Sequence, residues 1–224
     1  MYIKAAYDFL KNLKVVKNAS EHTLRNYAID LNSLKEYIEK EELDIQKPEF
    51  LPDKVRYNTE YEDRFIGKDQ VIQLDTITRN TIRGFLAWLN KNQSNKRTVV
   101  RRISSLRSFF KYCIVQNMIA TNPVEDIESP KIDKTVPTSL SFEQIQKLFD
   151  QPDTRTILGF RDRAIMELFY SSGLRVSELV SLNRVDFESE NLLLKLRGKG
   201  KKERIVPITK NAAEWIKAYL EHPE

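Results

Sequence analysis

A stretch near the middle of the chain, residues 121–139, most constrains how the sequence can fold. It carries Pro123, Pro130 and Pro137 among charged residues, with little hydrophobic periodicity. A residue that precedes proline disfavours the α-helical region, so the preceding helical pattern is expected to end at Asn122. Proline-rich, charged segments without a period are typical of linkers. We therefore expect two domains, residues 1–122 and 138–224, joined by a linker at residues 123–137.

The first part is predicted to be helical. Residues 1–12 show a short apolar pattern, and a longer stripe with apolar residues every three or four positions follows Ser20, a good helix-capping residue. Two further helices are expected, one capped by Asp75 or Thr76 and the other by Ser94. Residues 43–74 show no clear period, so we interpret them as a long connection with a short strand at 71–74.

The second part mixes helical and extended patterns. Ser141 and Gln144 form a capping box, and a second helix that follows residues 154–159 is expected to end at Gly173. A short helix should open at Ser177, and a last helix should span residues 210–221. Residues 192–197 and 203–208 are predicted to be two strands of a hairpin. The expected fold class is mainly α with a small β-hairpin or sheet.

Composition excludes several classes of protein. With 41% hydrophobic residues the chain can build a core, and no stretch approaches the roughly 18 apolar residues of a membrane span. The first residues lack the apolar segment of a signal peptide. One cysteine and two histidines leave little material for a disulfide or a metal site. We expect a cytoplasmic protein without a metal or cofactor.

The net charge of +5 is unevenly distributed. Residues 1–125 carry all of it, with 21 basic and 16 acidic residues, whereas residues 126–224 are balanced at 16 of each. No acidic residue occurs between Asp75 and Glu125, a run that holds Arg79, Arg83, Lys91, Lys96, Arg97, Arg101, Arg102, Arg107 and Lys111. Such a run indicates a polyanionic partner such as nucleic acid; the alternative is a solvated basic face without a ligand.

The predicted hairpin at residues 195–204 is the densest charged feature. One acidic residue, Glu203, stands against six basic ones, Lys195, Arg197, Lys199, Lys201, Lys202 and Arg204. Two glycines let its backbone approach a partner closely, and a β-ribbon can enter a nucleic-acid groove. A solvated hairpin tip is the alternative. The glycine spacing excludes a phosphate-binding P-loop.

Arg175 lies between a helix-ending glycine and a helix-opening serine. A guanidinium beside a helix N-terminus could bind a phosphate together with backbone N–H groups. It could equally be paired with Glu178, and the spacing alone leaves both readings open.

Several segments resemble the tyrosine recombinases of the Xer and phage-integrase type. They are Gly-Leu-Arg-Val-Ser-Glu-Leu at 173–179, the basic hairpin from Gly198 to Pro207, the segment 23–31, and the segment from Arg101 to Phe110 that leads to Asn122-Pro123. The resemblance covers nearly the whole chain. It implies a helical core-binding (SAM-like) domain that clamps DNA, followed by the first part of a mixed α+β catalytic domain.

The resemblance also implies a mechanism. Such enzymes cut one DNA strand with a tyrosine, which forms a 3′-phosphotyrosine, and neither a cofactor nor a metal is needed. Arg175 matches the arginine that holds the scissile phosphate, Lys199 matches the hairpin lysine that acts as general acid, and Glu178 would orient the site. The residues expected to bind duplex DNA are Lys96, Arg97, Arg101, Arg102, Arg107, Lys111, Arg197, Lys201, Lys202 and Arg204.

In the family, a His-x-x-Arg element and a C-terminal tyrosine follow the basic hairpin, and residues 208–224 contain no match to either. We therefore expect the chain to bind duplex DNA without cleaving it, and full-length relatives to act as tetramers on two sites. One alternative is a short relative that only binds DNA and acts as a regulator. Another is a non-enzymatic, helical nucleic-acid-binding module.

Overall fold

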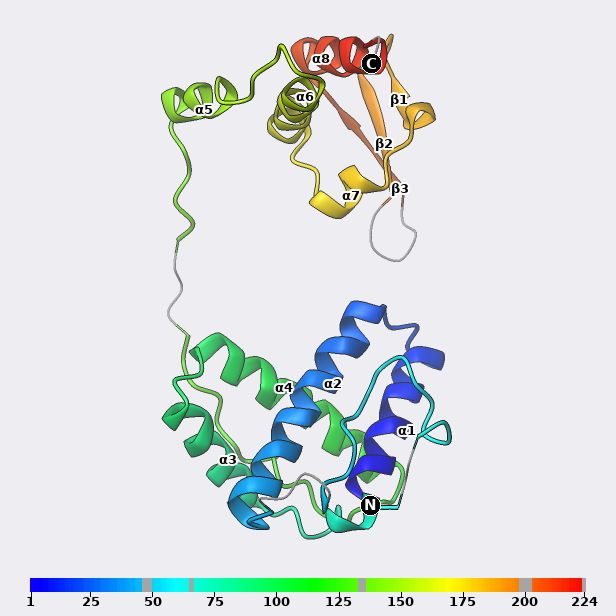
Figure 1. Ribbon diagram of the computed structural model, residues 1–224, viewed down its shortest axis with the longest axis vertical. Coiled ribbons are helices and arrows are strands. Elements are labelled where there is room, and N and C mark those ends of the chain that lie inside the picture. Colours follow the sequence, from blue (N-terminus) through cyan, green and yellow to red (C-terminus); the bar gives the residue numbers. More distant parts are fainter. Residues whose placement is uncertain (46–49, 65–66, 133–135, 198–202, 223–224) are drawn as a thin grey trace. The chain divides into compact units, whose positions relative to one another are not determined.

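The computed structural model describes residues 1–45, 50–64, 67–132, 136–197 and 203–222 (Figure 1). The chain divides into two compact units, Met1–Thr135 and Val136–Glu224, which we treat separately. None of the described helices is long and apolar enough to cross a lipid bilayer.

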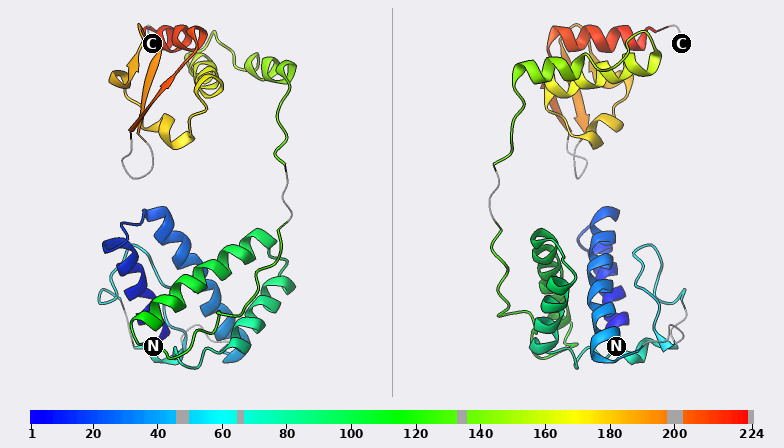
Figure 2. Two further views of the ribbon diagram at one scale, coloured as in Figure 1. Left: turned by 180° about the vertical axis from the view of Figure 1, so that it is seen from behind. Right: turned by 60° about the vertical axis from the view of Figure 1, so that its left-hand side comes forward.

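In the described part of the first unit, four α-helices share one core. They are α1 (Tyr2–Val15), α2 (Glu21–Tyr37), α3 (Arg79–Lys91) and α4 (Lys96–Val115), and a π-helical turn (Ile38–Glu42) extends α2. The rings of Tyr2 and Phe9 on α1 each lie 5.6 Å from that of Phe109 on α4, edge to face, which is a favourable aromatic geometry. Figure 2 shows α4 crossing α2. The helical prediction for this part is confirmed.

Two predicted helix starts were wrong by one to three residues. Thr78, not Asp75 or Thr76, caps α3, because the Thr78 hydroxyl accepts from the N–H of Thr81 while the Thr81 hydroxyl accepts from the N–H of Thr78. Asn95 caps α4 through its side-chain oxygen, which accepts from the N–H of Arg97. In each case the residue directly before the first turn accepts a hydrogen bond from a free N–H group of that turn, so it is the cap instead of the predicted residue.

The connection between α2 and α3 packs closely on the helices. Asn32 on α2 makes two 2.8 Å hydrogen bonds with the backbone of Val55, one to its N–H and one to its carbonyl. The predicted strand at 71–74 was wrong: a 3₁₀ turn, Asp69–Val71, is followed by Ile72, whose carbonyl accepts from the N–H of Tyr2 at 3.0 Å. Ile72 thus makes its backbone hydrogen bond to the start of α1 and not to a neighbouring strand.

The first unit also extends beyond residue 122. Val124 and Ile127 are buried in its core, and the Arg107 guanidinium donates to the carbonyl of Ile127 and, at 3.1 Å, to the hydroxyl of Ser129. The start of the expected linker is therefore packed against α4, because the side chains of Val124 and Ile127 are buried in the core of the first unit.

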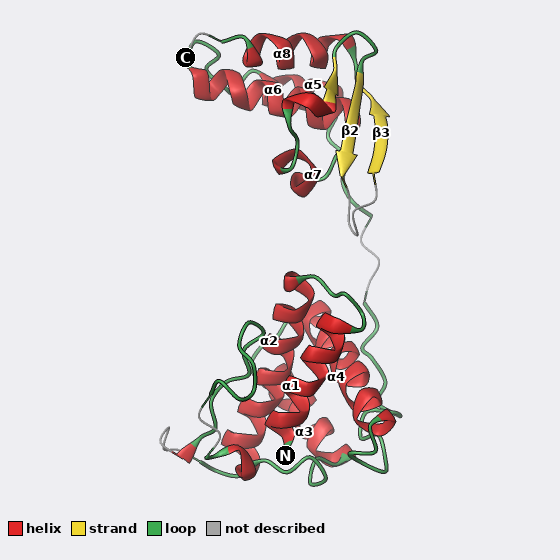
Figure 3. Cartoon of the chain, turned by 90° about the vertical axis from the view of Figure 1, so that its right-hand side faces the viewer, coloured by secondary structure: helices red, strands yellow, loops and turns green. Residues whose placement is uncertain are grey.

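The second unit combines helices with a three-stranded antiparallel sheet (Figure 3). Its elements are α5 (Phe142–Phe149), α6 (Ile157–Ser172), α7 (Val176–Val180), a 3₁₀ turn (Arg184–Asp186), β1 (Phe187–Glu188), β2 (Leu193–Arg197), β3 (Glu203–Pro207) and α8 (Lys210–Leu220). The strands follow the order β1-β2-β3, which leaves β3 at an edge. The hairpin prediction is confirmed; the two-residue β1 was not predicted.

The core of the second unit lies between the sheet and the helices. Leu194 and Leu196 of β2 point inward to pack with Leu168 of α6 and Ala212 of α8. The alternate residues Lys195 and Arg197 are exposed, and Leu193 is half-buried. This alternation is the period of two that a half-buried strand requires. The sheet therefore presents one apolar face to α6 and α8.

Arg163 fastens α5 to the rest of the second unit. Its guanidinium lies 4.9 Å from the ring centroid of Phe149 and 5.0 Å from that of Trp215. It also donates to the Phe149 carbonyl at 2.9 Å and to the Glu167 carboxylate at 2.7 Å. The two contacts with Phe149 hold α5, which has no fully buried residue, against α6.

Candidate nucleic-acid interface

Glu178 organises the basic residues of the second unit. Its carboxylate is buried, and it accepts hydrogen bonds from the Arg175 guanidinium at 3.0 Å, the Arg175 backbone N–H at 2.7 Å and the Arg204 guanidinium at 3.0 Å. The Arg204 bond, followed by the Arg175 backbone bond, lowers the pKa of Glu178 from 4.5 to about 2. One carboxylate thus joins two arginines that lie 29 positions apart in the sequence.

Arg175 is paired and yet accessible. It stands at the start of α7, directly after the turn in which Gly173 ends α6 with a φ of 56°, a left-handed conformation that glycine adopts without strain. Although one of its nitrogens binds Glu178, the side chain is 74% exposed. Of the two readings that the sequence left open, the pairing is present, and most of the guanidinium donors remain available for a phosphate.

A second buried carboxylate supports β2. Asp186 accepts from the guanidinium of the exposed Arg197 at 3.0 Å, and Lys195 pairs with Glu203 across the two strands at 2.9 Å. The predicted positive charge of the hairpin is thus partly neutralised at its base. Lys199, Lys201 and Lys202 lie outside the described residues, so the roles expected for them stay predictions.

In the first unit, the basic side of α4 is more closely tied to α2 than the sequence indicated. Asp30 of α2 is fully buried and accepts from Arg101 at 2.6 Å and from Ser105 at 2.7 Å, and its other oxygen lies 3.8 Å from Nε of Arg102. Arg107, as described above, binds residues of the segment that follows α4. These three arginines therefore have structural partners in addition to any external ligand.

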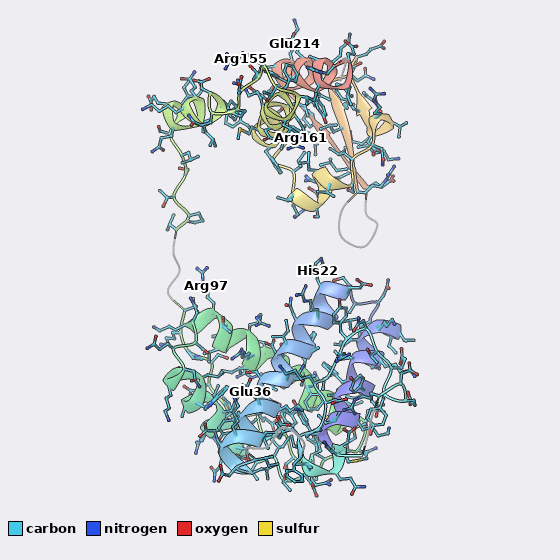
Figure 4. The ribbon with its side chains drawn as sticks, viewed as in Figure 1. His22, Glu36, Arg97, Arg155, Arg161 and Glu214 are labelled. Carbon is cyan, nitrogen blue, oxygen red and sulfur yellow. The ribbon has the colours of Figure 1, made fainter. Side chains whose placement is uncertain are left out.

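The remaining basic side chains of α4 lie at the surface. Lys96, Arg97 and Lys111 are exposed, and Arg97 lies at the same end of the first unit as His22 of α2, whereas Glu36 lies nearer the opposite end (Figure 4). The π-helical turn beyond Glu36 adds further acidic residues. Lys96 and Arg97 therefore lie at the end of the first unit where α2 and α4 begin, which we call the basic end.

Neither Asp30 nor Asp186 is among the site residues predicted from the sequence. A signal for Asp30 was present, because it stands three residues after Tyr27 and four before Leu34, on the apolar side of α2. A carboxylate at such a position requires a buried partner. Among the described residues no group of three or more metal-ligating side chains occurs.

Comparison with known proteins identifies the class. Residues 138–223 match the model of the phage integrase family, and residues 6–50 and 61–117 match that of the phage integrase N-terminal SAM-like domain. The chain therefore belongs to the phage integrase family, which confirms the resemblance noted from the sequence.

Within that family the similarity is to Xer-type recombinases. The chain is 44% identical over 223 residues to tyrosine recombinase XerC of Chlamydia caviae, which covers 99% of this chain and 68% of the relative. It is 37% identical to XerC of Syntrophus aciditrophicus over 213 residues, 95% of this chain and 62% of the relative. The chain thus spans about two thirds of the length of such relatives.

Solved structures show the same fold. The Tn1549 transposon integrase in complex with transposon right end DNA matches with a TM-score of 0.65 at 15% identity, covering 100% of this chain and 66% of that one. The XerH site-specific recombinase bound to a palindromic difH substrate matches with a TM-score of 0.61 at 21% identity, covering 96% and 57%. The predicted fold class, a helical SAM-like domain followed by part of a catalytic domain, is confirmed.

Proposed function

We propose that this chain serves site-specific recombination of duplex DNA by the tyrosine mechanism. The observation that carries the proposal is the Arg175–Glu178–Arg204 cluster, in which a buried carboxylate holds an exposed guanidinium at the start of a helix. Arg175 would bind the scissile phosphate and stabilise the charge that develops on it in the transition state. The similarity to XerC and the fold shared with DNA-bound integrases support the same assignment.

In the proposed reaction a tyrosine hydroxyl attacks the phosphate, a 3′-phosphotyrosine bond forms, and the bond to the 5′-oxygen breaks. Lys199 would protonate that leaving oxygen. The hydroxyl of the partner strand then attacks the phosphotyrosine and releases the tyrosine. Because the covalent link conserves the phosphodiester bond, these steps call for no external energy source. Glu178 would keep the guanidinium of Arg175 oriented throughout.

We assign the phosphate-backbone contacts to Lys96, Arg97, Arg101, Arg102, Arg107, Lys111, Arg197, Lys201, Lys202 and Arg204. We further propose that the full-length form assembles as a tetramer on two sites; lambda integrase forms a tetramer on a Holliday junction. The proposed location is the cytoplasm, where the DNA is accessible. A chain with a single cysteine forms no internal disulfide, which fits that reducing compartment. Residue 138 stays the proposed start of the second domain, whereas the first unit includes Val124 and Ile127.

The first experiment measures binding of the 224-residue polypeptide to duplex DNA over a range of salt concentrations. Phosphate contacts release counterions, so affinity should fall by about 10³ or more between roughly 50 and 200 mM salt if six or more phosphates are contacted. Charge reversal by Lys96→Glu and Arg101→Glu should weaken binding. The matched control is Lys40→Glu, since Lys40 lies beside Glu36, away from the basic end. A flat salt dependence, or an equal effect of the control, would refute the proposed surface.

The second experiment concerns cleavage. Residues 138–224, the part expected to be catalytic, include no His-x-x-Arg element, so this polypeptide alone should bind a nicked suicide substrate without a covalent adduct. A phosphotyrosine adduct on denaturing gels would contradict the proposed division of roles. Binding to single-stranded RNA that equals binding to duplex DNA would instead favour a non-enzymatic nucleic-acid-binding module.

A further inference from the structure

The contact between Asp30 and Arg101 joins a fully buried carboxylate to an accessible guanidinium. The two residues are 71 positions apart and link α2 to α4. The side chain of Arg101 is 42% exposed, and its bond to Asp30 uses one Nη1 donor. An arginine has five N–H donors, so the remaining ones can point to a ligand.

Stability alone gives a poor account of Asp30. Burial raises the pKa of this carboxyl even though Ser105 and the two arginines act in the opposite direction. Its Oδ1 atom has no hydrogen-bond partner among the described residues. Well-packed apolar residues in place of a buried ion pair are often neutral or stabilising. An acid on the apolar side of α2 therefore points to a role in the arrangement of the arginines.

Lys96 and Arg101 lie on the same helix, α4, and differ in whether the charged group is held in place. Lys96 is exposed, and among the described residues it has no carboxylate partner, so it supplies a charge on a flexible stem. Arg101 is held at one nitrogen before any ligand arrives, so less side-chain freedom remains to be lost on binding. The two residues should therefore respond differently when Asp30 is altered.

We propose that Asp30 is a positioning residue that fixes Arg101 for contact with a single DNA phosphate. This inference rests on the proposed function, because it names how one contact of that DNA-binding surface is preorganised. Asp30 itself touches no DNA and acts only through the guanidinium.

The test is a double-mutant cycle in DNA binding, measured by fluorescence anisotropy with the 224-residue polypeptide and a labelled duplex of about 30 base pairs. Arg101→Ala should weaken binding about five- to tenfold in the wild-type background, as expected for a charge-assisted contact, and less than about twofold in the Asp30→Asn background. Lys96→Ala is the matched control and should weaken binding by the same factor in both backgrounds. The coupling is diagnostic because removal of a negative charge also changes affinity by itself.

The inference would be overturned if Arg101→Ala weakened binding equally in the two backgrounds. It would also be overturned if the effect of Lys96→Ala depended on Asp30→Asn as strongly as that of Arg101→Ala does. If thermal unfolding shows that Asp30→Asn does not fold, Arg101→Lys provides the second measurement. It keeps the charge but loses the planar fork, so binding should be within about twofold of Arg101→Ala; binding within about twofold of wild type would overturn the inference. Failure of the wild-type chain to bind DNA would refute the proposed function instead.

Discussion

Replacement of Arg64 by methionine tests how the long connection between α2 and α3 is held on the first unit. The Arg64 guanidinium lies 5.4 Å from the ring centroid of Tyr7 and 5.7 Å from that of Tyr61, and it pairs with the buried carboxylate of Asp69. Both charged side chains are almost fully buried. Methionine keeps much of the volume but removes the charge, so Asp69 would remain without its counterion.

The expected loss follows from these contacts. Removal of one partner of a buried ion pair costs about 3–5 kcal/mol, because the remaining charge is uncompensated. Loss of the two ring contacts adds about 0.5–1 kcal/mol each. We therefore expect the free energy of unfolding of the first unit to fall by about 4–7 kcal/mol. The double variant Arg64→Met/Asp69→Leu should recover most of this loss, since no buried charge remains.

Urea unfolding followed by tryptophan fluorescence measures this effect. The chain has two tryptophans, so a Trp215→Phe background makes Trp88 the reporter of the first unit. Lys4→Met is the control, because the Lys4–Asp8 pair is solvent-exposed and should contribute less than about 1 kcal/mol. A loss below about 1 kcal/mol for Arg64→Met, or a double variant no more stable than the single one, would refute the reasoning.

Two further predictions concern the second unit. Because the pKa of Glu178 is lowered from 4.5 to about 2, its stabilising contribution is complete above pH 4.5 and is lost as the pH falls toward 2. Glu178→Gln should lower the melting temperature at about pH 6 and reduce its decrease between about pH 6 and pH 3; an unchanged decrease would contradict this assignment. Gly159→Ala should lower the urea midpoint, with a cost of about 1–3 kcal/mol, since a Cβ atom there would lie 2.1 Å from the backbone carbonyl oxygen of Asp153. An unaltered midpoint would contradict this prediction, because it would mean that the backbone at Asp153 moves away from the added Cβ atom without cost.

Elements whose signal is local could be predicted from the sequence. The apolar stripes predicted the helices, and the glycine-containing connection between residues 192–197 and 203–208 predicted the hairpin, because both signals depend only on nearby residues. The helix caps were harder, since Asp75, Thr76 and Thr78 are all acceptable capping residues and differ only in their reach to a free N–H group. β1 has two residues, too few to show a period.

The site depended on contacts between distant residues. Arg101 belonged to a basic run in the sequence, and nothing nearby showed that Asp30 anchors it. Arg204 and Glu178 are 26 positions apart, so their bond also arises only from the fold. The motif around Arg175 was informative because its partner Glu178 lies three residues away, within one turn.

The position of β3 at the edge of the sheet has a consequence for self-association. An edge strand offers backbone groups to which a strand of another chain can add, which is a route to aggregation. Ile205 is 62% exposed on β3 and would favour such stacking, whereas the charges of Glu203 and Arg204 and the missing N–H group of Pro207 oppose it. Arg204 therefore has two roles: it donates a hydrogen bond to Glu178, and its charge opposes the addition of another strand at the edge of the sheet.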